Sequence, residues 1–123
     1  DASQELGAYQ GSVYATRKSW AKGHRKELVA FMKAIAEAQE LIHTNKAKSM
    51  EVLKKHVKGI TSEDMAEMFK DMIAPGGFSR KAALNEKGMQ TVLDLRAIYG
   101  GQKFPGGYAK YIDTSYAKEA MKK

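Results

Sequence analysis

Cysteine is absent from the 123-residue sequence, which excludes disulfide bonds, thiolate metal sites and cysteine nucleophiles. Long apolar runs are absent too, because a charged residue, most often Lys or Glu, interrupts the apolar clusters. A membrane-spanning helix needs about 18 uninterrupted apolar residues, so no membrane span is expected. A chain of this length can build one modest hydrophobic core, and we therefore predict a single domain over residues 1–123.

Recognisable catalytic and metal-binding patterns are missing as well. The three histidines, His24, His43 and His56, lie far apart, and none forms the i, i+4 pair that presents two imidazoles to one metal. No serine has the G-x-S-x-G context of acyl transfer, and the glycine pairs 76–77 and 106–107 match neither a P-loop nor a dinucleotide fingerprint. We therefore expect a protein that is not an enzyme and that uses no cofactor.

Acidic residues are fewer than basic ones, with 14 Asp and Glu against 21 Lys and Arg and a formal net charge of +7. Such a charge favours an anionic partner. The basic residues form scattered pairs, however, with carboxylates such as Glu37 and Glu67 between them, so we interpret the pattern as a mixed, solvated surface and expect no nucleic-acid partner. Two alternatives stay open: a basic helical nucleic-acid-binding module, whose affinity would fall steeply with salt, and a helical protein-interaction module.

Apolar residues recur at helical spacing through most of the chain. The stripe that begins at Leu28 predicts one long helix with an apolar face. A polar break at residues 44–46 splits this helix, because Asn45 can stop one helix and cap the next. The second helix is expected to end near His56, before Gly59.

Capping and helix-breaking residues define the remaining helices. Thr61 is expected to cap a helix that ends before Pro75. Asn85 is expected to cap another, which ends at the next glycine pair. A last short helix is predicted from a cap at residues 113–114 through Lys123.

One short segment favours β-structure instead. Residues 12–16, with the sequence Ser-Val-Tyr-Ala-Thr, contain a β-branched residue and an aromatic residue and follow Gly11. One strand cannot form a sheet, so its unpaired N–H and C=O groups would invite pairing with another chain. The predicted fold class is therefore mainly α, with one short N-terminal strand.

The order of these segments resembles that of a known protein family. Several stretches are similar in order and spacing to solute-binding proteins of nitrate, sulfonate and taurine ABC importers, and to thiamine-precursor-binding proteins. They are residues 13–20, residues 26–34 and 37–38 with Asn45 and Ala47 after them, residues 91–95 before Gly100, and residues 111–116. The similarity covers nearly the whole chain. Two positions depart from the pattern, because Lys46 stands where a proline often follows the Asn and residues 23–24 replace an Asn-Pro pair. Both departures affect helix starts rather than ligand chemistry.

The resemblance implies a larger fold. Such proteins have the type II periplasmic-binding-protein fold, with two α/β lobes joined by crossover strands and the ligand held between them. This chain is too short for two lobes and corresponds to the C-terminal part, with residues 1–16 as the crossover-strand region and residues 17–123 as helices that cover the sheet of the first lobe. Without that sheet, we expect a homodimer formed through the N-terminal strand or through exposed helix faces.

The resemblance also implies binding without chemical conversion. The parent protein would capture a small anionic or zwitterionic solute in the periplasm by lobe closure and deliver it to an ABC permease. The candidate ligand-binding residues lead into the strand and are Tyr9, Gln10, Ser12 and Tyr14, which could stack on a solute or hydrogen-bond it. An ordinary hinge strand packed by Tyr14 is the alternative. The chain alone lacks most of the cleft and is expected to bind poorly.

Overall fold

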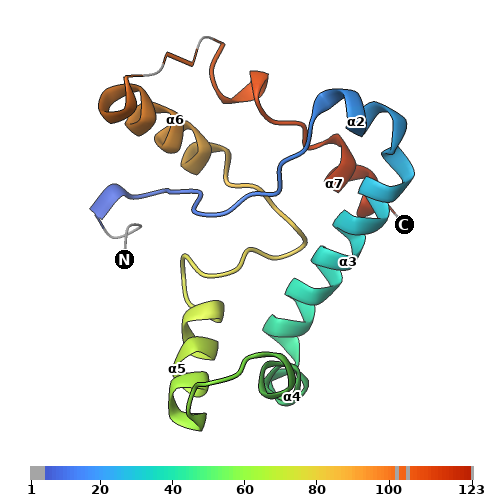
Figure 1. Ribbon diagram of the computed structural model, residues 1–123, viewed down its shortest axis with the longest axis vertical. Coiled ribbons are helices and arrows are strands. Elements are labelled where there is room, and N and C mark those ends of the chain that lie inside the picture. Colours follow the sequence, from blue (N-terminus) through green and yellow to red (C-terminus); the bar gives the residue numbers. More distant parts are fainter. Residues whose placement is uncertain (1–4, 102, 105, 123) are drawn as a thin grey trace.

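The computed structural model of the chain describes residues 5–101, 103–104 and 106–122. The predicted crossover-strand region therefore begins, at residues 1–4, outside the described residues. The described chain is mainly helical, as the sequence predicts (Figure 1). Its elements are, in order, α2 (Lys18–Gly23), α3 (Arg25–Thr44), α4 (Lys46–His56), α5 (Ser62–Ile73), α6 (Glu86–Gly100), the 3-10 turn η1 (Tyr108–Lys110) and α7 (Ser115–Ala120).

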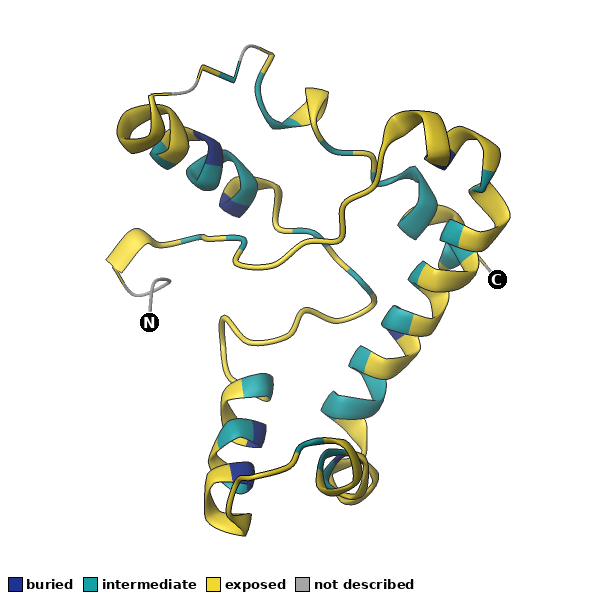
Figure 2. Ribbon diagram, viewed as in Figure 1, coloured by how far each residue is buried: buried dark blue, intermediate teal, exposed yellow. Residues whose placement is uncertain are grey.

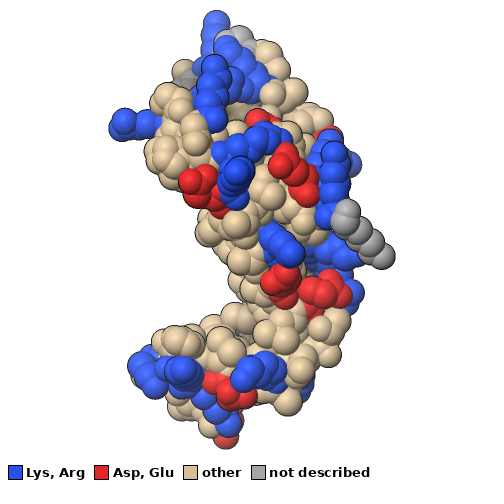
Figure 3. Space-filling view, turned by 90° about the vertical axis from the view of Figure 1, so that its right-hand side faces the viewer, with Lys and Arg blue, Asp and Glu red and all other residues tan. Residues whose placement is uncertain are grey.

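The helices form a crescent. Figure 3 shows the hollow of this crescent between a lower arm and a broader upper part. The lower arm consists of α4 and α5, and we call it the α4–α5 arm (Figure 1). Helix α3 connects this arm to the upper part, where α7 packs on α3. Helix α6 also lies in the upper part, on the side opposite α3 (Figure 1).

The predicted break between two helices is confirmed, and so is the cap of α5. Asn45 ends α3, where its N–H donates to the Leu41 carbonyl at 2.8 Å, and its side chain caps α4 by accepting from the Lys48 N–H at 3.0 Å. Thr61 forms a capping box, in which its hydroxyl accepts from the Asp64 N–H at 3.1 Å and the Asp64 carboxylate accepts from the Thr61 N–H at 3.4 Å. These side chains bind backbone N–H groups that have no partner within their helix.

Helices α6 and α7 also begin as predicted. The Asn85 side chain accepts from the Gly88 N–H at 2.9 Å, and Gly101 stops α6 in the left-handed conformation, with φ of +62°. The Asp113 carboxylate accepts from the Ser115 N–H at 2.9 Å at the start of α7. This helix ends at Ala120, and the last residue of the predicted helix, residue 123, lies outside the described residues.

The predicted N-terminal strand is not formed. Residues 12–16 are irregular, and no strand occurs in the described part of the chain. A strand needs a neighbour whose backbone groups complete its hydrogen bonds, and the described residues supply none. Despite their β-prone composition, residues 12–16 therefore remain without a partner strand among the described residues. They belong to the segment that crosses from α6 to α2 (Figure 1). The prediction of a strand was wrong for this chain.

Arg25 fastens α7 to the start of α3. Two nitrogens of its guanidinium donate to one oxygen of Glu119, Nε at 2.9 Å and Nη2 at 2.6 Å, and Nη1 donates to the Ser115 hydroxyl at 3.4 Å. The guanidinium also lies 4.7 Å from the ring centre of Tyr116. The hydrogen bond to Glu119 raises the pKa of Arg25, so the cation persists at any pH at which the protein folds.

Acid is expected to loosen α7, because Asp113 holds the first turn of this helix. Hydrogen bonds from Ser115, and then the positive charges of Arg25 and Lys18, lower the pKa of Asp113 below its ordinary value of 3.8. A carboxyl group whose folded-state pKa is lowered contributes stability that is complete above the unfolded-state pKa and is lost as the pH falls through the folded-state pKa. The amides of α7 should therefore lose protection against hydrogen exchange below pH 3.8.

The variant Asp113→Asn isolates this contribution. An asparagine keeps an oxygen that can accept from Ser115, but it does not titrate. Part of the pH dependence of α7 protection should therefore disappear in the variant. If the two proteins lose α7 protection over the same pH range and to the same extent, Asp113 does not have this role.

Little of the described chain is buried, as Figure 2 shows. The buried hydrophobic residues are Ala21, Ala36, Met65, Phe69 and Leu93. The accessible surface is 9250 Å², whereas a compact monomer of 13.6 kDa exposes about 6,600 Å². The apolar stripes predicted from the sequence thus form helices, but many of their side chains lack a covering element. No helix in the described ranges has the length and apolar character needed to cross a membrane.

Candidate functional site

The segment that holds the predicted ligand-binding residues is anchored on the start of α6. We call residues 7–17 the N-terminal segment. The Gln10 side chain accepts from the Asn85 N–H at 3.0 Å and donates to the Ser12 carbonyl at 2.7 Å. These two hydrogen bonds tie the segment to α6 and bend it locally. Gln10 therefore has a positioning role in this structure.

Gly88 allows the N-terminal segment to approach α6 closely. A Cβ atom at this position would lie 2.8 Å from both the Gln10 nitrogen and the Tyr9 carbonyl carbon. Real Cβ atoms essentially never come so close to backbone atoms, so a larger residue would displace the segment. A glycine inside a helix is less favourable than an alanine by about 1 kcal/mol. The close approach of the N-terminal segment explains why a glycine nevertheless occupies position 88.

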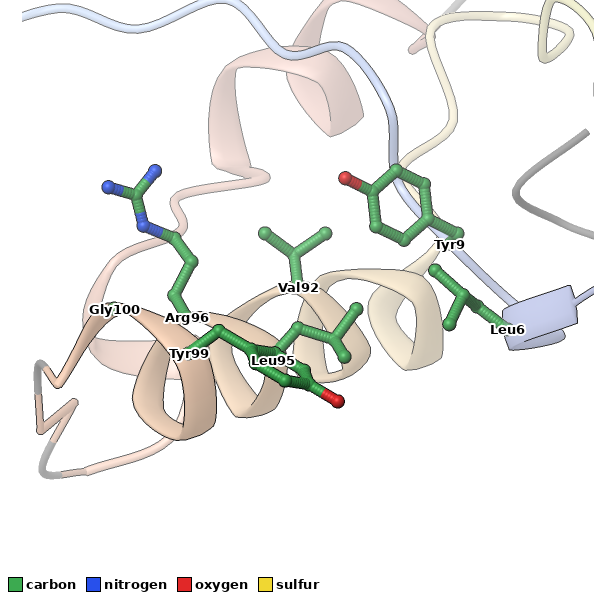
Figure 4. A pocket seen from close by; sticks show the side chains of 7 residues that line it. All are labelled: Leu6, Tyr9, Val92, Leu95, Arg96, Tyr99 and Gly100. Atoms are coloured by element: carbon green, nitrogen blue, oxygen red, sulfur yellow. The ribbon is translucent and has the colours of Figure 1, made fainter.

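An open groove lies where the N-terminal segment meets α6. We call it the α6 groove, and its volume is about 620 Å³. Figure 4 shows its lining, in which Val92 projects from α6 between the ring of Tyr9 on one side and the side chain of Arg96 on the other. The lining residues are Leu6, Tyr9, Val92, Leu95, Arg96, Tyr99 and Gly100. An apolar floor with two phenol rings and one guanidinium suits a ligand that has an apolar body and a negative charge.

Arg96 is the charged group of the α6 groove. Its guanidinium has neither a carboxylate nor a hydrogen-bond partner within the described residues. An unpaired guanidinium can bind a carboxylate, sulfonate or nitrate through its fork of N–H donors. The lining of the groove contains no carboxylate and no imidazole. In the described part of the chain, no three His, Asp or Glu side chains are grouped to hold a metal ion.

The four predicted ligand-binding residues are placed differently from one another. Tyr9 lines the α6 groove, whereas Gln10, Ser12 and Tyr14 do not. Ser12 is exposed, and Tyr14 packs edge-on against Phe31 of α3, with 4.9 Å between ring centres. The structure therefore brings Tyr9 alone to the groove. A role of the other three in solute binding stays a prediction.

Most of the groove residues were identified in the sequence only as part of an apolar helical stripe. Val92, Leu95 and Tyr99 fit the spacing of a buried face, and Leu6 lies before the N-terminal segment. Arg96 is the groove residue that the sequence could have singled out. It is the one basic residue in the mainly apolar run from residue 92 to residue 99, whose other charged residue is Asp94. The groove joins parts of the chain more than 80 residues apart, which local patterns do not reveal.

Comparisons with protein-family models, with curated proteins and with solved structures found no match to this chain.

Proposed function

We propose that residues 1–123 form the C-terminal part of the substrate-binding component of an ABC importer. This component captures a small anionic or zwitterionic solute in the periplasm and delivers it to the permease without converting it. One observation carries the proposal beyond the motif order: the chain exposes 9250 Å², against about 6,600 Å² for a compact monomer of its mass. Helices that cover the sheet of an absent lobe would have this excess of uncovered surface.

The unpaired N-terminal segment supports the same proposal. Val13 and Tyr14 are exposed, and the segment connects the α6 region to α2 and α3 with no partner strand in the described part of the chain. A crossover strand has these properties when the neighbouring strands of its sheet are missing. In the parent protein, such a segment would be the hinge about which the lobes close.

The α6 groove supports an anionic solute. Arg96 supplies a positive charge that has no partner among the described residues, and Tyr9 and Leu95 supply apolar contact area. Sulfonates with an alkyl body, carboxylates and nitrate share the negative charge that this lining would recognise. The groove is open to solvent, so the 123-residue chain alone should bind such solutes weakly.

The test uses the protein encoded by the complete reading frame that contains this sequence. We expect it to bind one of taurine, nitrate or a thiamine precursor in a calorimetric titration. Arg96→Gln should weaken that binding more than about tenfold, because a charged hydrogen bond is lost. Arg80→Gln is the matched control, since Arg80 is also exposed but lies in the loop between α5 and α6, outside the groove. A start codon immediately before Asp1, or a complete protein that binds none of these solutes, would refute the proposal.

A further inference from the structure

The loop between α5 and α6 is held against one face of α3. We call residues 74–85 the α5–α6 loop, and Figure 1 shows it turning toward α3 between the two helices that it connects. The Gln39 side chain accepts from the Ala82 N–H at 2.6 Å. His43 Nε2 lies 2.8 Å from the Phe78 carbonyl, which can only accept, so this nitrogen donates. Because Gln39 and His43 are four residues apart, one face of α3 carries both contacts.

The docked α5–α6 loop contains a strained turn. Lys81 and Ala82 have φ of 54° and 53°, and the Ala83 N–H closes the turn by donating to the Arg80 carbonyl at 3.0 Å. Turns with positive φ at both central positions favour Asn and Gly, because a Cβ atom makes the left-handed conformation unfavourable. The ion pair of Arg80 with Glu40 adds little, since it is 3.4 Å long and both side chains are exposed. The turn therefore persists because the hydrogen bonds to α3 hold it.

The α5–α6 loop ends at Asn85, where the N-terminal segment is attached. The Asn85 N–H donates to the Gln10 side chain at 3.0 Å, three positions after the attachment of Ala82 to α3. Among the described elements, α6 packs chiefly on η1, so its position relative to α3 depends on the segments that connect them. The N-terminal segment also reaches α3, where Tyr14 packs on Phe31. Two connections between α3 and α6 thus meet at Asn85.

We propose that the α5–α6 loop is a releasable clamp that controls the α6 groove. When the loop leaves α3, Asn85 moves, the N-terminal segment leaves α6, and Tyr9 leaves the groove. Only Ala83 and Leu84 separate the two attachment points, too few residues for one point to move freely without the other. Each attachment therefore forms more readily while the other is in place. This inference concerns the placement of Tyr9 and not the identity of any solute, so it does not rest on the proposed function.

Reciprocal substitutions, followed by hydrogen exchange resolved by residue, test this coupling. Gln39→Ala removes the acceptor of the Ala82 N–H and leaves Gln10 in place, yet it should speed exchange at Asn85 by at least about fivefold. Gln10→Ala removes the acceptor of the Asn85 N–H and leaves Gln39 in place, yet it should speed exchange at Ala82. The two factors should be equal, because the coupling free energy between two sites is reciprocal.

Lys81→Gly should act in the opposite direction. Glycine adopts a φ of 54° without strain, and this relief should outweigh the extra freedom of a released glycine loop. Exchange at Ala82 and at Asn85 should then both be slower than in the unaltered chain. Gln90→Ala is the matched control, because the Gln90 side chain bonds Asp94 within α6 instead of either attachment. Both amides should exchange in this control as they do in the unaltered chain.

Two results would overturn the inference. One is exchange at Asn85 that Gln39→Ala leaves unchanged, or exchange at Ala82 that Gln10→Ala leaves unchanged. The other is a Gln90→Ala protein in which both amides exchange as fast as in the two test variants. Helix α7 carries neither attachment, so unchanged protection of its amides shows that a variant stays folded and that release is not confused with unfolding.

Discussion

Gly88→Ala is expected to release the N-terminal segment from α6 and to abolish the α6 groove. In an exposed helix, this substitution would stabilise the protein by up to about 1 kcal/mol, because alanine is the better helix former. Here the added Cβ would lie 2.8 Å from backbone atoms of Tyr9 and Gln10, which cannot move aside as a flexible side chain does. Gly88→Ala should therefore destabilise the protein instead of stabilising it, and Tyr9 should leave the groove.

Hydrogen exchange at Asn85 reports this release directly. Its N–H donates to the Gln10 side chain, a contact that exists only while the segment is docked, so Gly88→Ala should abolish its protection. Trypsin should also cleave faster after Arg17, at the end of the freed segment. Gly100→Ala is the control in the same helix, because a Cβ there meets nothing within 4 Å and should leave Asn85 protected. A Gly88→Ala protein that is more stable and keeps Asn85 protected would show that the close approach is wrong.

Phe69→Ala is expected to unfold the α4–α5 arm while the rest of the chain stays folded. Phe69 is 2% exposed, and deletion of such a ring costs about 3–5 kcal/mol. The arm has little else to hold it, because the other buried hydrophobic residue of α4 and α5 is Met65. Helices α4 and α5 contact each other and the end of α3, whereas α7 packs on α3 and α6 lies elsewhere. Loss of this small core should therefore remain local.

Hydrogen exchange resolved by residue separates local from global unfolding. In Phe69→Ala, the amides of α4 and α5 should exchange as in an unfolded chain, whereas those of α6 and α7 should keep their protection. Ile73→Ala is the control on the same helix, since Ile73 is 43% exposed and its truncation should cost less than about 1 kcal/mol. Equal loss of protection in α5 and α7 would mean that the two parts fold as one cooperative unit.

The helix boundaries could be predicted from the sequence because they depend on neighbouring residues. Asn45, Thr61 and Asn85 each bind an N–H group three residues ahead, so the cap and its partner are visible in one short stretch. Gly101 ends α6 for an equally local reason, its left-handed backbone conformation. Caps and helix ends of this kind form whatever the rest of the chain contacts.

The strand and the groove could not be predicted because they depend on distant parts of the chain. Residues 12–16 have β-prone composition, but composition does not supply the neighbouring strand that their backbone groups need. The groove exists because Gly88 lets Tyr9 pass over α6, a contact across 79 positions. The periodicity around Ile98 is that of a buried face, and this face is uncovered because no described element packs on it.

Under the proposed function, residues 12–16 would pair with strands encoded upstream in a larger binding protein. Amide hydrogen exchange at residues 12–16 tests it most directly when the 123-residue chain is compared with the protein from the complete reading frame. We expect fast exchange in the chain alone and strong protection in the complete protein, because a paired strand shields its N–H groups. Equally fast exchange in both proteins would contradict it.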